Sequence, residues 1–191
     1  MSRLYYGLIF FIAITLTVSC GLIEFDFSTS AKGKIKKPDF CPPQTGVFEI
    51  PQAFKEHLTS QLNDVISNSF DDIIAEVKKQ DTWPADEIIL TKLSMEQTSI
   101  PSSPASYSTL GFISELKIYI SLDDGSDEFL FASVKNSDDK ARKLVFDVAD
   151  KTKNIINYID KGFKIRIDSK LRDCPSEDIA FKNNLTVHIK L

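Results

Sequence analysis

An acidic turn near the middle of the chain carries side chains that could coordinate a cation. Asp123, Asp124 and Asp127 lie close together around Gly125. Calcium prefers several oxygen ligands from one tight loop, but this turn lacks the EF-hand pattern with its distal glutamate. A hairpin turn also favours Asp and Gly for the conformation of its own backbone. We therefore expect no metal here and keep calcium as the weaker alternative.

Other side chains with catalytic potential are few and scattered. The two histidines, His57 and His188, do not belong to a cluster of His, Cys and Asp residues with the spacing of metal ligands. The sequence contains no Gly-x-Ser-x-Gly motif and no glycine-rich phosphate loop. These features predict a protein without a cofactor and without catalytic activity. An enzyme of unknown class is kept as an alternative to a noncatalytic function.

Cys20 lies at the end of the only long apolar stretch of the chain. Arg3 is the single basic residue before it, and residues 4–19 contain no charged side chain. A short positively charged start, an apolar stretch and small residues before a cleavage point are typical of an export signal. We therefore predict that residues 1–19 form a signal peptide.

The residues around Cys20 resemble the lipobox of bacterial lipoproteins. Thr17, Val18, Ser19, Cys20 and Gly21 carry this resemblance. It implies that Cys20 carries acyl chains such as palmitate, that residues 1–19 are removed and that the new N-terminal amine is acylated. Several acyl chains would hold the protein firmly on a membrane. By analogy, the absence of Asp after the cysteine implies the outer membrane, with the domain facing the periplasm or the exterior.

Two alternatives to lipid attachment remain open. Residues 4–23 have about the length needed to cross a bilayer as an uncleaved helix, roughly 20 residues. A simple secretory signal would be cleaved and would leave no anchor. All three interpretations place residues 24–191 outside the cytoplasm.

The other two cysteines, Cys41 and Cys174, form an even pair once Cys20 is assigned to lipid. Each is next to proline, and export would place both in an oxidising compartment. We expect a disulfide between them, which would join the start of the domain to its last loop and restrict the unfolded chain. Two free thiols or a metal site are the alternatives.

The charge balance excludes one class of partner. The formal net charge is −4, and cleavage before Cys20 would remove a further cation, Arg3. No strong positive field and no interleaving of basic and aromatic residues is present, so we expect no nucleic acid partner. We expect the basic residues between Lys32 and Lys37 to be solvated or to lie near anionic headgroups. The expected partners are the membrane, through the N-terminal lipid, and an envelope protein or a lipid.

Residue periodicity predicts the elements that position these side chains. Residues 20–45 show no sustained periodicity and are predicted to form a lipid-anchored tether, followed by a single globular domain over residues 46–191. Apolar residues at spacings of three and four predict an amphipathic helix over about residues 53–79. Alternation predicts strands near residues 88–97, 112–122, 128–134, 144–148, 163–167 and 185–191, with one or two helical turns before Gly162.

These elements predict a mainly β, α+β fold. The expected architecture is an antiparallel β-sandwich of about six or seven strands over about residues 86–191, with a long N-terminal helix and a short crossover helix. A closed barrel is the alternative. Residues 155–167, followed by Pro175 and a final strand, are similar to the C-terminal half of small exported lipoproteins with an Ig-like or late-embryogenesis-type β-sandwich. This second resemblance implies no functional residue.

The apolar face of the long helix is expected to be core or to cover a pocket for a hydrophobic ligand. The candidate lining residues of that pocket are Phe54, Leu58, Leu62, Phe70 and Phe112. The predicted function is a membrane-anchored, noncatalytic binding or assembly module of the cell envelope. A hydrophobic-ligand or lipid-binding module is the alternative, which a continuous apolar cavity would favour and a fully packed interface would exclude.

Overall fold

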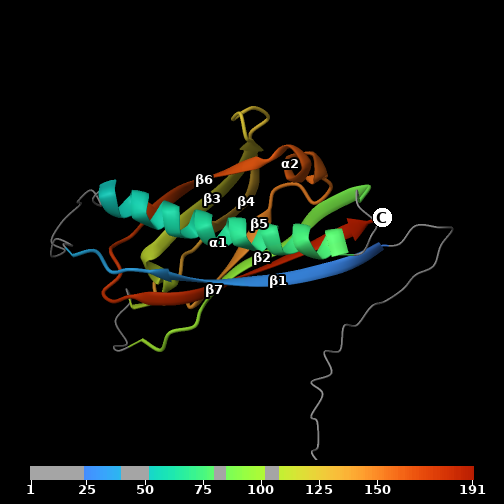
Figure 1. Ribbon diagram of the computed structural model, residues 1–191. Helices are drawn as coiled ribbons and strands as arrows, with labels where there is room; N and C mark the ends of the chain where they lie inside the picture. Colours follow the sequence, from blue (N-terminus) through green and yellow to red (C-terminus); the bar gives the residue numbers. More distant parts are fainter. Residues whose placement is uncertain (1–23, 40–51, 80–84, 102–107) are drawn as a thin grey trace, which may run out of the picture.

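Alternating apolar and polar residues make seven strands in the described residues, and an apolar stripe makes the long helix. The computed structural model describes residues 24–39, 52–79, 85–101 and 108–191 (Figure 1). The strands are β1 (Glu24–Ile35), β2 (Glu87–Gln97), β3 (Ile113–Leu122), β4 (Phe129–Lys135), β5 (Lys143–Val148), β6 (Phe163–Leu171) and β7 (Ile179–Lys190). The helices are α1 (Gln52–Lys79) and α2 (Ile156–Lys161), with a 3-10 turn at Leu110–Phe112.

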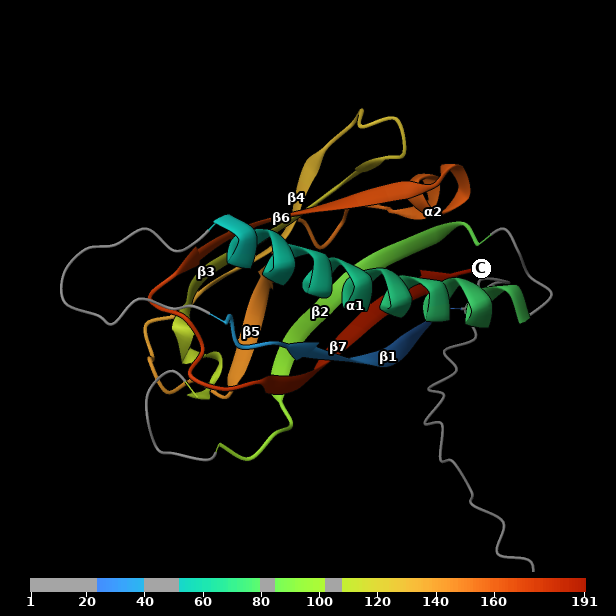
Figure 2. The same cartoon turned by 60° about the vertical axis from the view of Figure 1, so that its left-hand side comes forward.

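All seven strands belong to one sheet, in the order β1-β7-β2-β5-β4-β3-β6. Neighbouring strands are antiparallel throughout. The sheet curls so that α1 lies along its concave face (Figures 1 and 2). The prediction of a mainly antiparallel β fold with helical additions is confirmed. The described strands form one curled sheet in place of the two facing sheets of a sandwich.

Helix α1 covers the concave face of the sheet, where a sandwich would have its second sheet. Its buried side chains recur at spacings of three and four and make up one stripe: Phe54, Leu58, Leu62, Val65, Ile66, Phe70 and Ile73. The helix contacts both edge strands, β1 and β6, and also β7. One long amphipathic helix therefore suffices to close the core of a strongly curled sheet.

Strand β1 corrects the predicted tether. Residues 24–35 form the first edge strand of the sheet and pair with β7 along their whole length. Phe25, Phe27 and Ile35 point inward, but Thr29 and Gly33 occupy inward positions between them and interrupt the apolar alternation. Because of this interruption, the segment has the sequence pattern of a polar linker. Folded structure is therefore present from Glu24, well before residue 46.

The hairpin and the short helix occur where the sequence predicts them. Strands β3 and β4 pair on either side of the acidic turn. Helix α2 precedes β6 and ends at Gly162, whose φ of 86° lies in the left-handed region that glycine adopts without strain. The backbone of Ile155 donates to the carbonyl of Ile88 at 2.9 Å, which fixes the start of α2 against β2.

Candidate functional site

Of the three cysteines, only Cys174 belongs to the described residues. Cys174 is buried and disulfide-bonded. The predicted lipid-bearing Cys20 and the predicted partner Cys41 both fall outside the described residues, so their roles stay predictions.

A buried carboxyl group precedes this disulfide. Asp173 is 2% exposed, and its Oδ1 accepts a hydrogen bond from the backbone N–H of Cys174 at 2.7 Å. Its Oδ2 is buried and has no hydrogen-bond partner. Burial raises the pKa of this carboxyl because the charged form is poorly solvated there, and the single hydrogen bond from Cys174 offsets only part of this effect. The neighbouring Arg172 instead donates to the backbone carbonyls of Gly111, Ile113 and Asn136.

The three carboxylates of the acidic turn have separate partners. Asp123 forms an ion pair with Lys164 at 3.7 Å. Asp124 Oδ1 accepts hydrogen bonds from the N–H and the hydroxyl of Ser126, which lower its pKa. No group of three or more His, Cys, Asp or Glu side chains suited to a metal occurs in the described part of the chain. The turn is therefore arranged as the end of a hairpin, with local partners for Asp123 and Asp124.

Asp127, the third of these residues, connects the turn to α2. It has a positive φ of 53°, and its Oδ2 accepts a hydrogen bond from the hydroxyl of Tyr158 at 2.7 Å. Its backbone carbonyl accepts a second, longer bond from the same hydroxyl. Tyr158 is buried, and its ring packs against Phe129. The Tyr158–Asp127 contact thus holds the crossover helix against the β3–β4 hairpin.

Replacing Tyr158 with Phe is expected to lower the free energy of unfolding by about 1–2 kcal/mol at neutral pH, since one hydrogen bond to a carboxylate is lost. Burial and the Asp127 bond raise the pKa of Tyr158 to about 12. An unfolded tyrosine titrates near pH 10, so the folded state alone keeps the proton between about pH 10 and 12. The stabilisation is complete below pH 10 and is lost as the pH rises through this interval.

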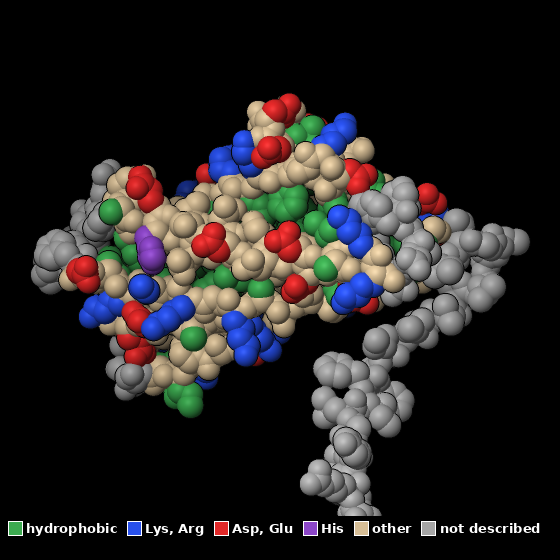
Figure 3. All heavy atoms as spheres, viewed as in Figure 1, with side chains coloured by type: hydrophobic (Ala, Val, Ile, Leu, Met, Phe, Trp, Pro, Cys, Tyr) green, Lys and Arg blue, Asp and Glu red, His purple; other side chains and the backbone are tan. Residues whose placement is uncertain are grey.

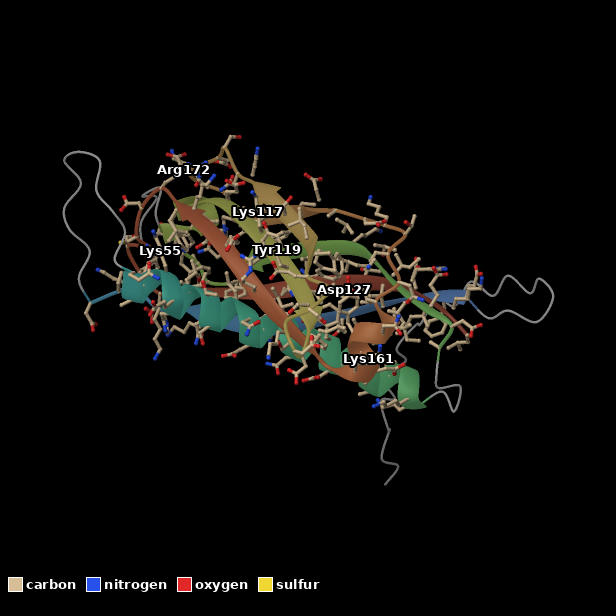
Figure 4. The ribbon with its side chains drawn as sticks, turned by 90° about the horizontal axis from the view of Figure 1, so that it is seen from above. Lys55, Lys117, Tyr119, Asp127, Lys161 and Arg172 are labelled. Carbon is tan, nitrogen blue, oxygen red and sulfur yellow. The ribbon has the colours of Figure 1, made fainter. Side chains whose placement is uncertain are left out.

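Urea denaturation of the wild-type protein and the Tyr158→Phe variant, at neutral pH and at several alkaline pH values, measures both effects. The difference in stability between the two proteins should shrink as the pH rises above about 10. Tyr119, which lies on the outer face of β3, provides the control substitution Tyr119→Phe (Figure 4). A wild-type minus variant difference that does not change with pH would contradict the assignment.

The five residues predicted to line a hydrophobic pocket are packed core. Each is at most 4% exposed. The ring of Phe54 lies 6.4 Å from that of Phe112, and the ring of Phe70 lies 5.5 Å from that of Phe131. Leu58 and Leu62 are equally covered. None of these five residues lines either of the two surface hollows described below.

The histidines have different environments. His57, on α1, has a buried Nε2 without a hydrogen-bond partner. His188 lies on the outer face of β7, with its Nδ1 3.0 Å from Asp26 Oδ1 on the neighbouring strand. Its Nε2 is 3.8 Å from Glu24 Oε2. Neither histidine is part of a metal-binding group within the described residues.

The outer face of β3, β4 and β6 is held by paired charges. Glu115 on β3 contacts Lys170 at 2.6 Å and Lys117 at 3.4 Å, and these contacts lower its pKa. Arg166 on β6 binds Glu128 at 2.8 Å and lies over the ring of Tyr119 at 4.0 Å. Lys117 and Tyr119 both project from β3 in Figure 4. The charges on this face are therefore mostly neutralised by each other.

The first hollow lies between the N-terminal half of α1 and the edge strand β6. It has a volume of about 510 Å³ and is lined mainly by polar residues of the helix, including Lys55 and Asn63, and by residues 167–169. Lys55 projects from the helix in Figure 4. The Oδ1 atom of Asn63 is buried without a hydrogen-bond partner. Its charged residues, Lys55, Glu56 and Asp168, are of both signs, so the groove carries no concentration of one charge.

The second hollow is a window in the outer face of the sheet where β2 and β5 separate. Their ladder ends at the pair Leu93–Phe146, after which β5 pairs with β4 through Asp147 and Val148. The hollow lies over this point of divergence and the adjoining end of the ladder, and it has a volume of about 610 Å³. We call it the β2–β5 window. Its lining residues are Thr91, Lys92, Leu93, Ser94, Lys143, Val145, Phe146, Asp147, Val148 and Lys151.

An isolated bridge closes the other end of the β2–β5 window. Ile89 pairs with Asn154, so within the described residues the β2 positions 90–92 have no strand partner on that side. A β-bulge at Thr91 keeps Leu90 buried and directs Lys92 outward. Sequence reasoning missed this site, because its lysines are far apart in the chain and a bulge leaves no clear pattern.

The described residues thus form a β-rich α+β domain, in which a long helix packs against one curled antiparallel sheet. No protein-family model and no curated protein matches the sequence. Among the helices of the described residues, none has both the length and the apolar character needed to cross a membrane.

Proposed function

We propose that the chain is an exported lipoprotein whose domain acts at a membrane surface as a noncatalytic binding or assembly module. The observation that carries this proposal is the uncharged stretch of residues 4–19, which ends at Cys20 shortly before β1. Cys20 would bear the lipid and become the mature N-terminus. The absence of Asp at position 21 favours the outer membrane, with the domain facing the periplasm or the exterior.

The position of β1 supports a domain held close to the bilayer. Glu24 begins the strand only four positions after Cys20. It lies opposite Lys190 of β7, and on the other side of β7 Lys190 lies opposite Glu87 of β2. We call this part of the sheet the Glu24 end. Four residues span at most about 14 Å even when fully extended. A lipid on Cys20 would therefore place the Glu24 end within that distance of the membrane surface.

The side chains at the Glu24 end suit this placement. Phe25, Phe27, Ile156 and Leu191 are apolar and only partly buried. Asn154, just before α2, donates to the carbonyl of Asp86 at 3.0 Å, which brings the start of α2 to the same end. Apolar side chains also reach the surface along the border between α1 and the sheet (Figure 3). Such side chains near the lipid would favour contact with the headgroup region.

Intact-protein mass spectrometry of the full chain, expressed in a bacterium that processes lipoproteins, tests the anchor. We expect loss of residues 1–19 and the added mass of three acyl chains on Cys20. The Cys20→Ser variant should keep its full N-terminal segment, whereas the control Ser19→Ala should be processed like the wild type. An unmodified wild-type protein that keeps residues 1–19 would overturn the lipoprotein proposal.

We also propose that the disulfide partner of Cys174 is Cys41. If Cys20 carries a thioether-linked lipid, Cys41 is the only other cysteine in the sequence. Peptide mapping of the same sample without reductant should yield a linked peptide that contains both residues. A linked peptide between Cys20 and Cys174 would contradict both this pairing and the lipid assignment.

A further inference from the structure

The β2–β5 window concentrates positive charge on an acidic chain. Lys92, Lys143 and Lys151 line it, together with a single carboxylate, Asp147. The three lysines form no ion pair with any described residue. Since the formal net charge of the whole chain is −4, this local excess of cations runs against the average of the molecule.

The divergence of the strands keeps Lys92 from neutralising Asp147. If the β2–β5 ladder continued one residue beyond Leu93–Phe146, Lys92 and Asp147 would stand opposite each other. Instead, Asp147 pairs with Ser133 of β4, and the window opens between the two side chains. At the other end of the ladder, Lys143 stands opposite Glu96, whose carboxylate contacts Lys182 at 3.6 Å.

We propose that the β2–β5 window binds an anion of the phosphate type. Lysine ammonium groups are point charges with three donors each, and they bind phosphate oxygens without a fixed orientation. Small-molecule sites usually have volumes of roughly 300–1,000 Å³, a range that includes this window. Val145, which is 64% exposed, adds an apolar surface beside the lysines. The ligand is therefore a phosphate group, free or attached to a larger molecule.

The height of the window above the Glu24 end bears on the source of the phosphate. Thr91 and Ser94 are four and seven residues from Glu87 along β2, which corresponds to about 13–23 Å at the rise of a strand. If the Glu24 end faces the membrane as proposed, headgroups of the same bilayer lie below the window. A phosphate-bearing molecule in solution fits this arrangement better than a lipid headgroup. The proposed anion site itself does not depend on the lipid anchor.

Isothermal titration of the purified full chain, in a nonionic detergent at low salt, tests the site with inorganic pyrophosphate as the probe. We expect saturable binding that weakens as salt is added. The triple variant Lys92→Gln, Lys143→Gln and Lys151→Gln should bind at least about tenfold more weakly, since each lost cation removes an attractive charge. All three lysines are exposed, so the fold should not change. The variant Asp147→Asn should instead bind several-fold more tightly.

A matched control separates the window from a general effect of charge. Lys135 is exposed on β4, is not part of the window lining and forms no ion pair with described residues, so Lys135→Gln should bind pyrophosphate like the wild type. Vesicles of phosphatidylglycerol form a second arm, and competition by these vesicles would assign the phosphate to a lipid headgroup. Absence of saturable binding in both arms, or equal weakening by Lys135→Gln and by each single window variant, would overturn the proposal.

Discussion

Replacing Gly33 with alanine is expected to lower the free energy of unfolding by about 1–3 kcal/mol, the usual cost of overpacking a core. A Cβ atom at Gly33 would lie 2.5 Å from Val65 Cγ2 and 2.6 Å from Phe181 Cζ. Both distances are far below van der Waals contact, so the side chains of Val65 and Phe181, or the elements that carry them, would have to shift. The glycine therefore lets β1 approach the helix closely enough to bury Ile35.

Chemical denaturation of the wild type, Gly33→Ala and the control Lys32→Ala measures this effect. Lys32 points outward from the same strand and is exposed, so its replacement should change stability by less than about 0.5 kcal/mol. The double variant Gly33→Ala with Val65→Ala should show a smaller cost for the glycine substitution, because the nearest atom is removed. If Gly33→Ala is as harmless as Lys32→Ala, residues 24–35 are a linker after all and the placement of β1 is wrong.

Replacing Gly111 with alanine is expected to have a still larger effect, a loss of more than about 3 kcal/mol. A Cβ atom at this position would lie 1.8 Å from the carbonyl oxygen of Asp139 and 2.1 Å from its carbonyl carbon. These are backbone atoms, which cannot turn aside as a side chain can. The 3-10 turn at Leu110–Phe112 and the β4–β5 connection would have to separate, and the hydrogen bond from Arg172 to the Gly111 carbonyl would be strained.

A third glycine, Gly125, offers a matched comparison with Gly111 because its surroundings are open. It has a φ of 84°, and no atom lies within 4 Å of the position that a Cβ would occupy. Gly125→Ala should therefore cost only the backbone strain, roughly 1 kcal/mol. Thermal unfolding of both variants, monitored by circular dichroism, distinguishes the two causes. Equal losses for Gly111→Ala and Gly125→Ala would contradict the close approach at Gly111.

Local sequence patterns were sufficient for elements whose apolar residues repeat without interruption. The spacing of Phe54, Leu58 and Leu62 predicts the helix that the structure has at Gln52–Lys79, and the Asp-Gly turn predicts the β3–β4 hairpin. Strand β1 was missed because Thr29 and Gly33 break its inward face. Gly33 is small for a reason that only the packed structure reveals, namely its contact with α1.

The number of sheets was not predictable from periodicity. Alternation shows which face of each strand is apolar, but it does not show whether two apolar faces belong to facing sheets or to one curled sheet. In this protein the strands form one sheet because β5 pairs briefly with β2 and then with β4. It thereby joins strands β1, β7 and β2 to strands β4, β3 and β6. The same divergence creates the β2–β5 window, so the difference from a sandwich and the missed site have one cause.

Among the candidate functional residues, features set by neighbouring residues were predictable from the sequence, and features that join distant residues were not. The hairpin role of the acidic turn followed from its residue types, because Asp124 and Gly125 satisfy the backbone locally. The bond between Asp127 and Tyr158 joins residues that are distant in sequence, and it needed the fold. Whether the apolar face of the helix is core or lines a pocket depends on how closely it packs against the sheet, which periodicity does not show. The burial of Leu58 and Phe112 places them in the core.

The distances of the two ends of β2 from the membrane test most directly whether the domain is held with its Glu24 end at the membrane surface. Spin labels at Asp86→Cys and Thr98→Cys, both exposed, would stand on either side of a strand about 36 Å long. The full chain is reconstituted in vesicles that carry a paramagnetic chelate on their headgroups. We predict strong relaxation of the label at position 86 and little at position 98. Equal weak relaxation at both positions, or a stronger effect at position 98, would contradict a domain held with its Glu24 end at the membrane.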